Sequence, residues 1–201
     1  MISNDLMHFH PRPDLTAPVL HYYSVLGRAL NVAQHLEIGC RALMSMFYLK
    51  THPEELFEPK TSAADPRDPG EPRDGIRDLK TSKGILTKME QIAKKTLGQQ
   101  VKALGDKEIV SPNLSRLLGE ATEARNALIH SIVTEVEDRE DLDFKKMVDE
   151  IVVIVRNLAA ADKWIAALLT MLNKDPLPGG RFFDTYEDRL AEWVTAPTFR
   201  S

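Results

Sequence analysis

One short segment, Glu-Ala-Arg-Asn-Ala-Leu-Ile-His-Ser at 123–131, contains side chains that can bind an anion and transfer a proton. Arg125 carries a planar guanidinium whose donors fit the oxygens of a phosphate. His130 carries an imidazole, the side-chain type that most readily gives and takes protons near neutral pH. Asn126 both donates and accepts hydrogen bonds. These side chains form the candidate site.

A helix must position these groups, and the surrounding pattern predicts one over 111–136. Ser111 is a good N-cap, and Pro112 suits the first helical position. At about 100° per residue, Arg125 falls near the centre of the apolar sector of this helix. The apolar sector consists of Leu114, Leu117, Leu118, Ala121, Leu128, Ile129, Ile132 and Val136.

A guanidinium in an apolar sector requires a partner or access to water, because burying it alone costs several kcal/mol. Arg125 is therefore expected to pair with Glu37 or Asp162, to face a cleft, or to face water at an interface. Asn126 and His130, four residues apart, share one flank. Glu123 lies on the same polar side as His130.

The spacing of Arg125 and His130 bears on oligomeric state. The two residues are about 140° apart around a straight helix and about 7.5 Å apart along it. Such a helix does not easily direct both side chains at one phosphate. Either a distortion of the helix or a facing helix from a second subunit would bring them together. The geometry thus suggests a site at a two-fold contact, and so a homodimer.

The stretch from Arg125 to His130 resembles the R-N-x-x-x-H signature of HEPN domains. These domains are helical bundles that commonly dimerise. Many are metal-independent endoribonucleases, often toxins or anti-phage effectors, and others are non-catalytic. The resemblance implies an RNA substrate, a homodimer and a possible antitoxin or other partner protein, with no cofactor. The alternative function is a helical interaction or scaffold module that binds a protein or nucleotide partner.

The chemistry implied by this resemblance uses the RNA 2′-hydroxyl as nucleophile. His130 acts as general acid or base, Arg125 stabilises the phosphate, and Asn126 orients the imidazole or contacts the phosphate. Glu123 is a supporting residue. Glu37 either supports the site, since the family often has a polar or acidic residue there, or forms a surface pair with Arg41 at i, i+4.

Periodicity along the rest of the chain predicts an all-α fold, an up-and-down four-helix bundle with a short additional C-terminal helix. The bundle, HEPN-like in outline, covers 18–173. It follows an irregular N-terminal arm at 1–17 and precedes a C-terminal turn and docking helix at 174–201. The expected helices are 18–50, 76–104, 111–136, 141–173 and 184–194, with a long Pro-rich loop at 51–75. The last helix has Tyr186, Leu190, Trp193 and Val194 on its docking side.

Charge is distributed unevenly along the 201 residues, whose net charge is −4. The whole molecule is therefore no general polyanion binder. The segment from Arg77 to Lys107 contains eight Lys or Arg and three acidic residues, which gives it a net charge of +5. It is either a solvated face or an RNA contact. The candidate RNA-binding residues are Lys83, Lys88, Lys94 and Lys95.

The remaining chemistry-bearing residues indicate little. Cys40, the single cysteine, falls on the apolar side of the first helix and is expected to be a small buried hydrophobe. His8 and His10 have H-x-H spacing without an accompanying cluster, so no metal site is predicted. His35 is placed on a polar helix face. The longest aliphatic run, 151–155, is too short to cross a bilayer and no signal peptide is recognised, so a cytoplasmic protein is expected.

Overall fold

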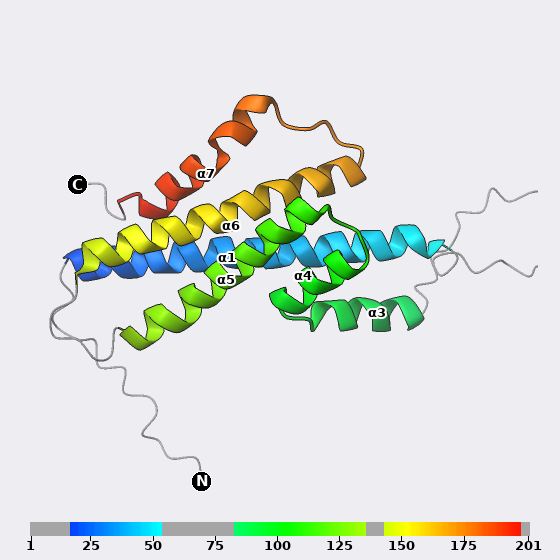
Figure 1. Cartoon of the computed structure of the whole chain (residues 1–201), viewed down its shortest axis with the longest axis horizontal. Coiled ribbons are helices and arrows are strands. Elements are labelled where there is room, and N and C mark those ends of the chain that lie inside the picture. Colours follow the sequence, from blue (N-terminus) through cyan, green and yellow to red (C-terminus); the bar gives the residue numbers. More distant parts are fainter. Residues whose placement is uncertain (1–16, 54–82, 136–142, 198–201) are drawn as a thin grey trace, which may run out of the picture.

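The computed structural model describes residues 17–53, 83–135 and 143–197, apart from the side chains of Lys83 and of 131–135. Within these ranges the secondary structure is helical and contains no strand, so the all-α expectation is confirmed (Figure 1). The N-terminal arm and most of the Pro-rich loop lie outside the described residues. The helices are α1 (Ala17–Thr51), α3 (Lys83–Ala93), α4 (Leu97–Asp106), α5 (Pro112–Glu135), α6 (Phe144–Leu172) and α7 (Gly180–Thr195).

The two longest helices, α1 and α6, lie side by side and run in the same direction (Figure 1). Two contacts near opposite ends of the pair fix this direction. The rings of Tyr22 and Phe144 are 5.7 Å apart, and Lys50 Nζ donates to the carbonyl of Leu172 at 3.0 Å. In an up-and-down bundle of four helices, the first and fourth run in opposite directions. The observed order therefore contains one more reversal than the sequence analysis expects.

The extra reversal lies in the segment predicted as one helix over 76–104, and for its described part that prediction is wrong. The chain leaves helical geometry at 94–96 and divides into α3 and α4. Thr96 accepts a hydrogen bond from the backbone N of Gln99 at 3.4 Å, and the Gln99 side chain accepts one from the backbone N of Thr96 at 3.0 Å. This reciprocal capping box begins a new helix. It is visible in the sequence as Thr-x-x-Gln.

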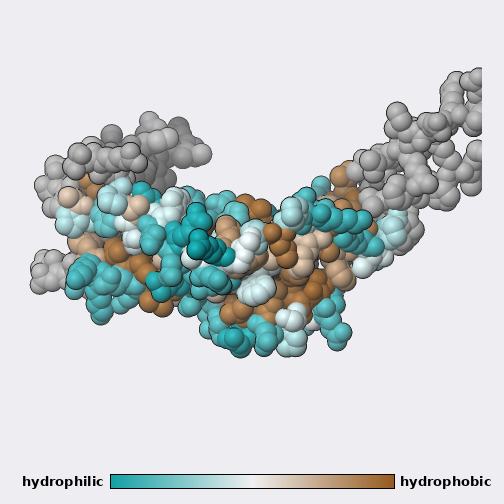
Figure 2. Space-filling view, turned by 90° about the horizontal axis from the view of Figure 1, so that it is seen from above, coloured by the Kyte–Doolittle hydropathy of each residue, from teal (hydrophilic) through white to brown (hydrophobic). Residues whose placement is uncertain are grey.

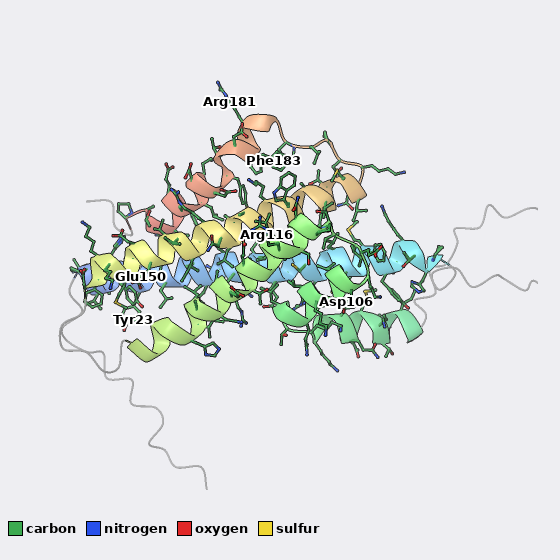
Figure 3. All side chains as sticks on the ribbon, viewed as in Figure 1. Tyr23, Asp106, Arg116, Glu150, Arg181 and Phe183 are labelled. Atoms are coloured by element: carbon green, nitrogen blue, oxygen red, sulfur yellow. The ribbon has the colours of Figure 1, made fainter. Side chains whose placement is uncertain are left out.

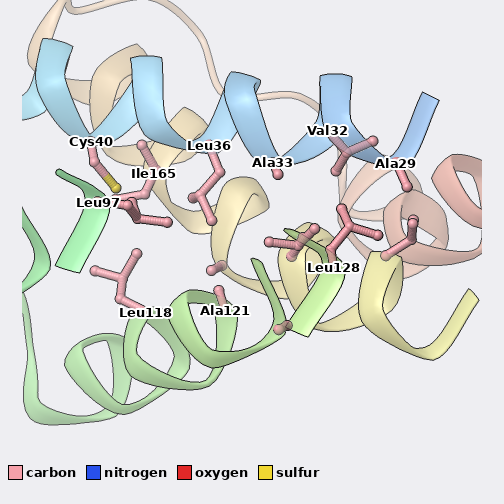
Figure 4. Packing of buried hydrophobic residues seen from close by; sticks show 14 of the residues in the cluster. Ala29, Val32, Ala33, Leu36, Cys40, Leu97, Leu118, Ala121, Leu128 and Ile165 are labelled. Atoms are coloured by element: carbon pink, nitrogen blue, oxygen red, sulfur yellow. The ribbon is translucent and has the colours of Figure 1, made fainter. Parts of the chain in front are cut away.

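The core lies between α1, α4, α5 and α6 (Figure 4). Its largest fully buried side chains include Leu36 on α1, Leu118 on α5 and Ile165 on α6. Each large apolar side chain of this kind contributes about 1.5–3 kcal/mol when buried. Of the apolar positions predicted for the helix at 111–136, Leu114, Leu118, Ala121 and Leu128 are buried, and Cys40 is fully buried as expected.

Close packing of α1 on α6 depends on Gly39. A Cβ atom at this position would lie 2.9 Å from Cγ2 of Ile165, which is itself fully buried. Real Cβ contacts essentially never come this close, so the two helices approach one another only because residue 39 has no side chain.

Local capping explains where the other helices begin. Ser111 Oγ accepts from the backbone N of Leu114 at 3.3 Å, as predicted for the start of α5. Asp143 caps α6 through the backbone N of Lys146 at 3.1 Å. α7 begins at Gly180, about one turn before the predicted start at 184, so the glycines at 179 and 180 adjoin the helix rather than ending the turn.

The C-terminal helix α7 packs along α6 and touches α1. Figure 3 shows Phe183 between α7 and α6, while Arg181 points away from the molecule. Only Ala191 and Val194 of α7 are buried, and the predicted docking residue Trp193 is 48% exposed. Polar contacts hold much of this helix. Arg28 of α1 donates to the carbonyls of Trp193, Val194 and Ala196, and Lys163 contacts Glu187 at 2.6 Å.

The surface seen in Figure 2 shows hydrophobic side chains in separate patches between hydrophilic ones. Among the described helices, none is both long enough and apolar enough to cross a membrane.

Candidate functional site

The predicted site lies on α5, which runs unbroken through 125–130. Arg125 continues the stripe of Leu118, Ala121 and Leu128, all of which are almost fully buried. Its own side chain is 32% exposed. The guanidinium extends toward Glu37 of α1 at the edge of the core, where water still reaches it. Arg125 is thus a cation at an apolar margin that keeps contact with water.

Glu37 of α1 lies between two arginines. Its Oε1 accepts from Arg41 Nη2 at 3.1 Å, and its Oε2 is 3.9 Å from Arg125 Nη2. Both alternatives for Glu37 are therefore present in part, the i, i+4 pair and the contact with the α5 motif. Two cations share one carboxylate, so the cluster of Glu37, Arg41 and Arg125 carries a net positive charge. We call these residues, together with Asn126, the Arg125 cluster.

Asn126 is exposed and takes part in the cluster through its amide oxygen. Oδ1 accepts from Arg125 Nη1 at 3.3 Å. The contact restrains the guanidinium, whose Nη2 faces Glu37. Arg41 adds an unusual feature, because its buried Nε has no hydrogen-bond partner among the described residues.

His130 and Glu123 are both exposed. Because α5 is continuous, His130 stays about 140° around the helix from Arg125. The structure therefore brings together Arg125, Asn126 and Glu37, and one subunit does not direct His130 at the same point. The helix has no break at 125–130.

The candidate RNA-binding lysines occupy two positions. Lys88 of α3 is half-buried, and its Nζ lies 5.7 Å from the centre of the Tyr48 ring. Lys94 and Lys95 lie at the break between α3 and α4, where Lys94 is exposed and Lys95 partly so. The side chain of Lys83 lies outside the described residues. The lysines follow a broken path rather than one helix face.

A second polar cluster, which the sequence did not predict, surrounds Asp162. Asp162 of α6 is 2% exposed, and each of its oxygens has one partner. Oδ1 lies 3.0 Å from His35 Nδ1, and Oδ2 accepts from the hydroxyl of Tyr186. The suggested pairing of Arg125 with Asp162 is therefore wrong. We call His35, Asp162 and Tyr186 the Asp162 cluster.

The sequence did contain one signal for this cluster, since Asp162 falls within the apolar stripe of the helix predicted at 141–173. Its partners come from distant segments. His35 was expected on a polar face and is indeed 70% exposed, yet its Nδ1 is held. Burial and the hydrogen bond to Asp162 raise the pKa of Tyr186 well above its usual value, so its hydroxyl stays protonated and donates.

Cys40 is buried close to both clusters. Burial, with the nearby charges of Asp162 and Glu37, raises the pKa of its thiol to about 12. A thiol that stays protonated is a poor nucleophile and a poor metal ligand. Within the described ranges, no group of three or more His, Cys, Asp or Glu side chains is placed to hold a metal. His8 and His10 lie outside those ranges.

Comparison of the chain with protein-family models, with curated proteins and with solved structures finds no match.

Proposed function

We propose that this protein is a metal-independent endoribonuclease of the HEPN type that works as a homodimer, in a toxin or anti-phage role. The observation that supports the proposal is the Arg125 cluster. Arg125 lies at the edge of the core, bonds to Asn126 and shares Glu37 with a second arginine. A net positive, partly water-accessible pair of guanidiniums suits an RNA phosphate.

The reaction needs one proton acceptor and one proton donor. A neutral His130 removes the proton of the 2′-hydroxyl, whose oxygen then forms a bond to the adjacent phosphorus. The bond from phosphorus to the 5′-oxygen breaks, and a protonated His130 of a second subunit supplies the proton to that leaving oxygen. Arg125 neutralises the charge that builds on the non-bridging oxygens. The products are a 2′,3′-cyclic phosphate and a 5′-hydroxyl.

The continuity of α5 supports the proposed dimer. A second α5 that faces the first would bring the imidazole of one subunit and the guanidinium of the other to one phosphate. The scaffold that we propose is a HEPN-like bundle of α1, α5 and α6, with the α3–α4 hairpin in place of the expected second helix. It works in the cytoplasm.

The alternative is a non-catalytic interaction module, and one contact favours it. Glu37 approaches both guanidiniums, so an anion must compete with a carboxylate already present. If that carboxylate is not displaced, the same face serves as a charged surface for a protein partner. A measurement of RNA cleavage distinguishes the nuclease from the interaction module.

The test is incubation of the purified protein with mixed RNA in EDTA, followed by analysis of the product ends. We expect cleavage by the wild type and a loss of about 100-fold or more in His130→Ala and Arg125→Ala. Arg116→Ala is the matched control, because Arg116 is an exposed arginine on the same helix that pairs with Glu120. It should cleave normally. Absence of cleavage by the wild type would favour the interaction module, whereas unchanged cleavage by His130→Ala would contradict the proposed catalytic site.

The dimer is tested separately by the mass of the protein in solution. We expect twice the chain mass of 22.6 kDa at the concentration at which RNA is cut. A fully active monomer would contradict the two-subunit mechanism while leaving the nuclease activity in place.

A further inference from the structure

A cavity of about 340 Å³ opens where α1, α6 and α7 meet, and no residue of the Arg125 cluster lines it. It has the size range of small-molecule sites, which begins at about 300 Å³. Its lining combines apolar side chains, Val32 and Leu190, with the whole Asp162 cluster. Such a mixture is typical of ligand pockets, in which a few fixed polar groups orient a largely apolar contact.

Its most distinctive polar group is His35. The imidazole is 70% exposed, yet Nδ1 is held 3.0 Å from a carboxylate that is almost fully buried. Both ring edges cannot face Asp162, so Nε2 is directed away from it. An exposed histidine with a fixed ring is a prepared hydrogen-bonding group, as in sites where a carboxylate orients an imidazole.

The buried side of the cluster keeps that orientation rigid. The hydroxyl of Tyr186 donates to the second oxygen of Asp162, so the carboxylate is held from α1 and α7 at once. Arg28 donates to the carbonyl of Trp193 at 3.1 Å and to that of Ala196 at 2.6 Å. These bonds anchor the end of α7 to α1 and fix one wall of the cavity.

Trp193 forms that wall and leaves a large aromatic surface in water. Its side chain belongs to the cavity lining and remains 48% exposed, although its backbone is anchored. The guanidinium carbon of Arg28 lies 5.9 Å from the centre of the ring. Asn31, one turn before His35, adds an amide that both donates and accepts hydrogen bonds.

From these contacts we infer that the cavity binds a nucleobase, with its ring against Trp193 and its hydrogen-bonding edge toward His35 and Asn31. A base is flat and aromatic, stacks on an indole, and carries donors and acceptors along one edge. The cavity, the fixed imidazole and the exposed indole each match one of these properties. The inference does not depend on the nuclease proposal, because it uses different residues.

The experiment uses the full chain carrying Trp164→Phe, which leaves Trp193 as its single tryptophan. Adenosine, guanosine, cytidine, uridine and ribose are titrated while Trp193 fluorescence is followed, and calorimetry repeats each titration on the wild type. We expect saturable binding of at least one nucleoside with a Kd below about 1 mM, and none of ribose. His35→Leu should weaken binding about tenfold or more.

Controls separate this site from the Arg125 cluster and one ligand source from another. Arg125→Ala should bind nucleosides as the wild type does. If a single-stranded oligoribonucleotide binds the Arg125→Ala chain at least tenfold more tightly than the nucleosides do, and adding His35→Leu weakens both, the occupant is a base within a strand. Equal affinities identify a free nucleoside. No saturable binding of any nucleoside or oligoribonucleotide by both methods, or binding unchanged in His35→Leu, would overturn the inference.

Discussion

The Arg125 cluster and the Asp162 cluster both place charge beside the core, but they do so in opposite ways. In the first, a carboxylate that is 23% exposed meets one guanidinium at 3.1 Å and another at 3.9 Å. In the second, a carboxylate that is 2% exposed has a donor at each oxygen. Water can replace the partners of Glu37, whereas it cannot readily replace those of Asp162.

This difference in burial makes the ion pairs of the Arg125 cluster exchangeable and the hydrogen bonds of the Asp162 cluster fixed. A loosely paired cation can exchange its protein carboxylate for an incoming phosphate at little cost, because surface ion pairs contribute about 0–1 kcal/mol. A buried carboxylate needs all its donors, since removing one leaves a charge that is poorly solvated. The Arg125 cluster is thus suited to bind and release an anion, and the Asp162 cluster to hold neighbouring groups still.

The largest expected effect compares nearly isosteric changes in the two clusters. Tyr186→Phe removes one donor from the buried carboxylate and should lower the free energy of unfolding by about 2 kcal/mol. Glu37→Gln should lower it by less than about 1 kcal/mol, because Glu37 remains partly hydrated. Urea unfolding followed by circular dichroism measures both. Equal losses, or a larger loss in Glu37→Gln, would remove the distinction.

A smaller effect concerns the spacing of α1 and α6. Gly39→Ala gains about 1 kcal/mol in helix propensity but loses about 1–3 kcal/mol to overpacking against Ile165, so we expect a net loss of about 1 kcal/mol. Gly27→Ala is the matched control, since a Cβ there meets nothing within 4 Å, and it should gain up to about 1 kcal/mol.

The same pair of variants sharpens the comparison of the clusters. Gly39→Ala moves α6 relative to α1, so it should weaken nucleoside binding in the cavity while RNA cleavage, which depends on α1 and α5, changes little. A stable Gly39→Ala, or one that loses cleavage and keeps nucleoside binding, would show that this helix spacing does not set the Asp162 cluster.

The smallest effect is a dependence on alkaline pH. Cys40 and Tyr186 are neutral when protonated, and their pKa values are raised above the ordinary 9.0 and 10.0. Their stabilising effect is therefore complete below those values and declines as pH rises above them, by at most about 1.4 kcal/mol per pH unit for each group. The stability gap between wild type and Tyr186→Phe should narrow from about pH 8 to about pH 10.5. A constant gap would contradict this assignment.

Much of the fold could be predicted because helical periodicity is local information. The stripes of α1, α5 and α6, the Ser111 cap and the burial of Cys40 follow from spacing and residue type. The break at 94–96 was not predicted, although the Thr96–Gln99 capping box that begins α4 can be recognised in the sequence. Because of this additional turn, α5 and α6 run in directions opposite to those expected relative to α1.

Of the two candidate sites, the one formed by a local motif could be predicted from the sequence, and the one formed by distant residues could not. Arg125, Asn126 and His130 lie within one turn and a half of helix, so their motif is legible in the chain. The partnership of His35 with Asp162 joins residues separated by 127 positions. It depends on the parallel alignment of α1 and α6, which the expected bundle did not contain. Trp193 was assigned to a docking face because its spacing fits, yet the anchored end of α7 leaves its ring in the cavity wall.

Because Cys40 is buried, the reactivity of its thiol reports local opening of the core. Its sulfur is sealed where α1, α4 and α6 converge (Figure 4). A maleimide or iodoacetamide reaches this thiol, the only cysteine in the sequence, only when the three helices separate. The rate of alkylation under native conditions therefore counts how often the centre opens, with no label engineered into the polypeptide.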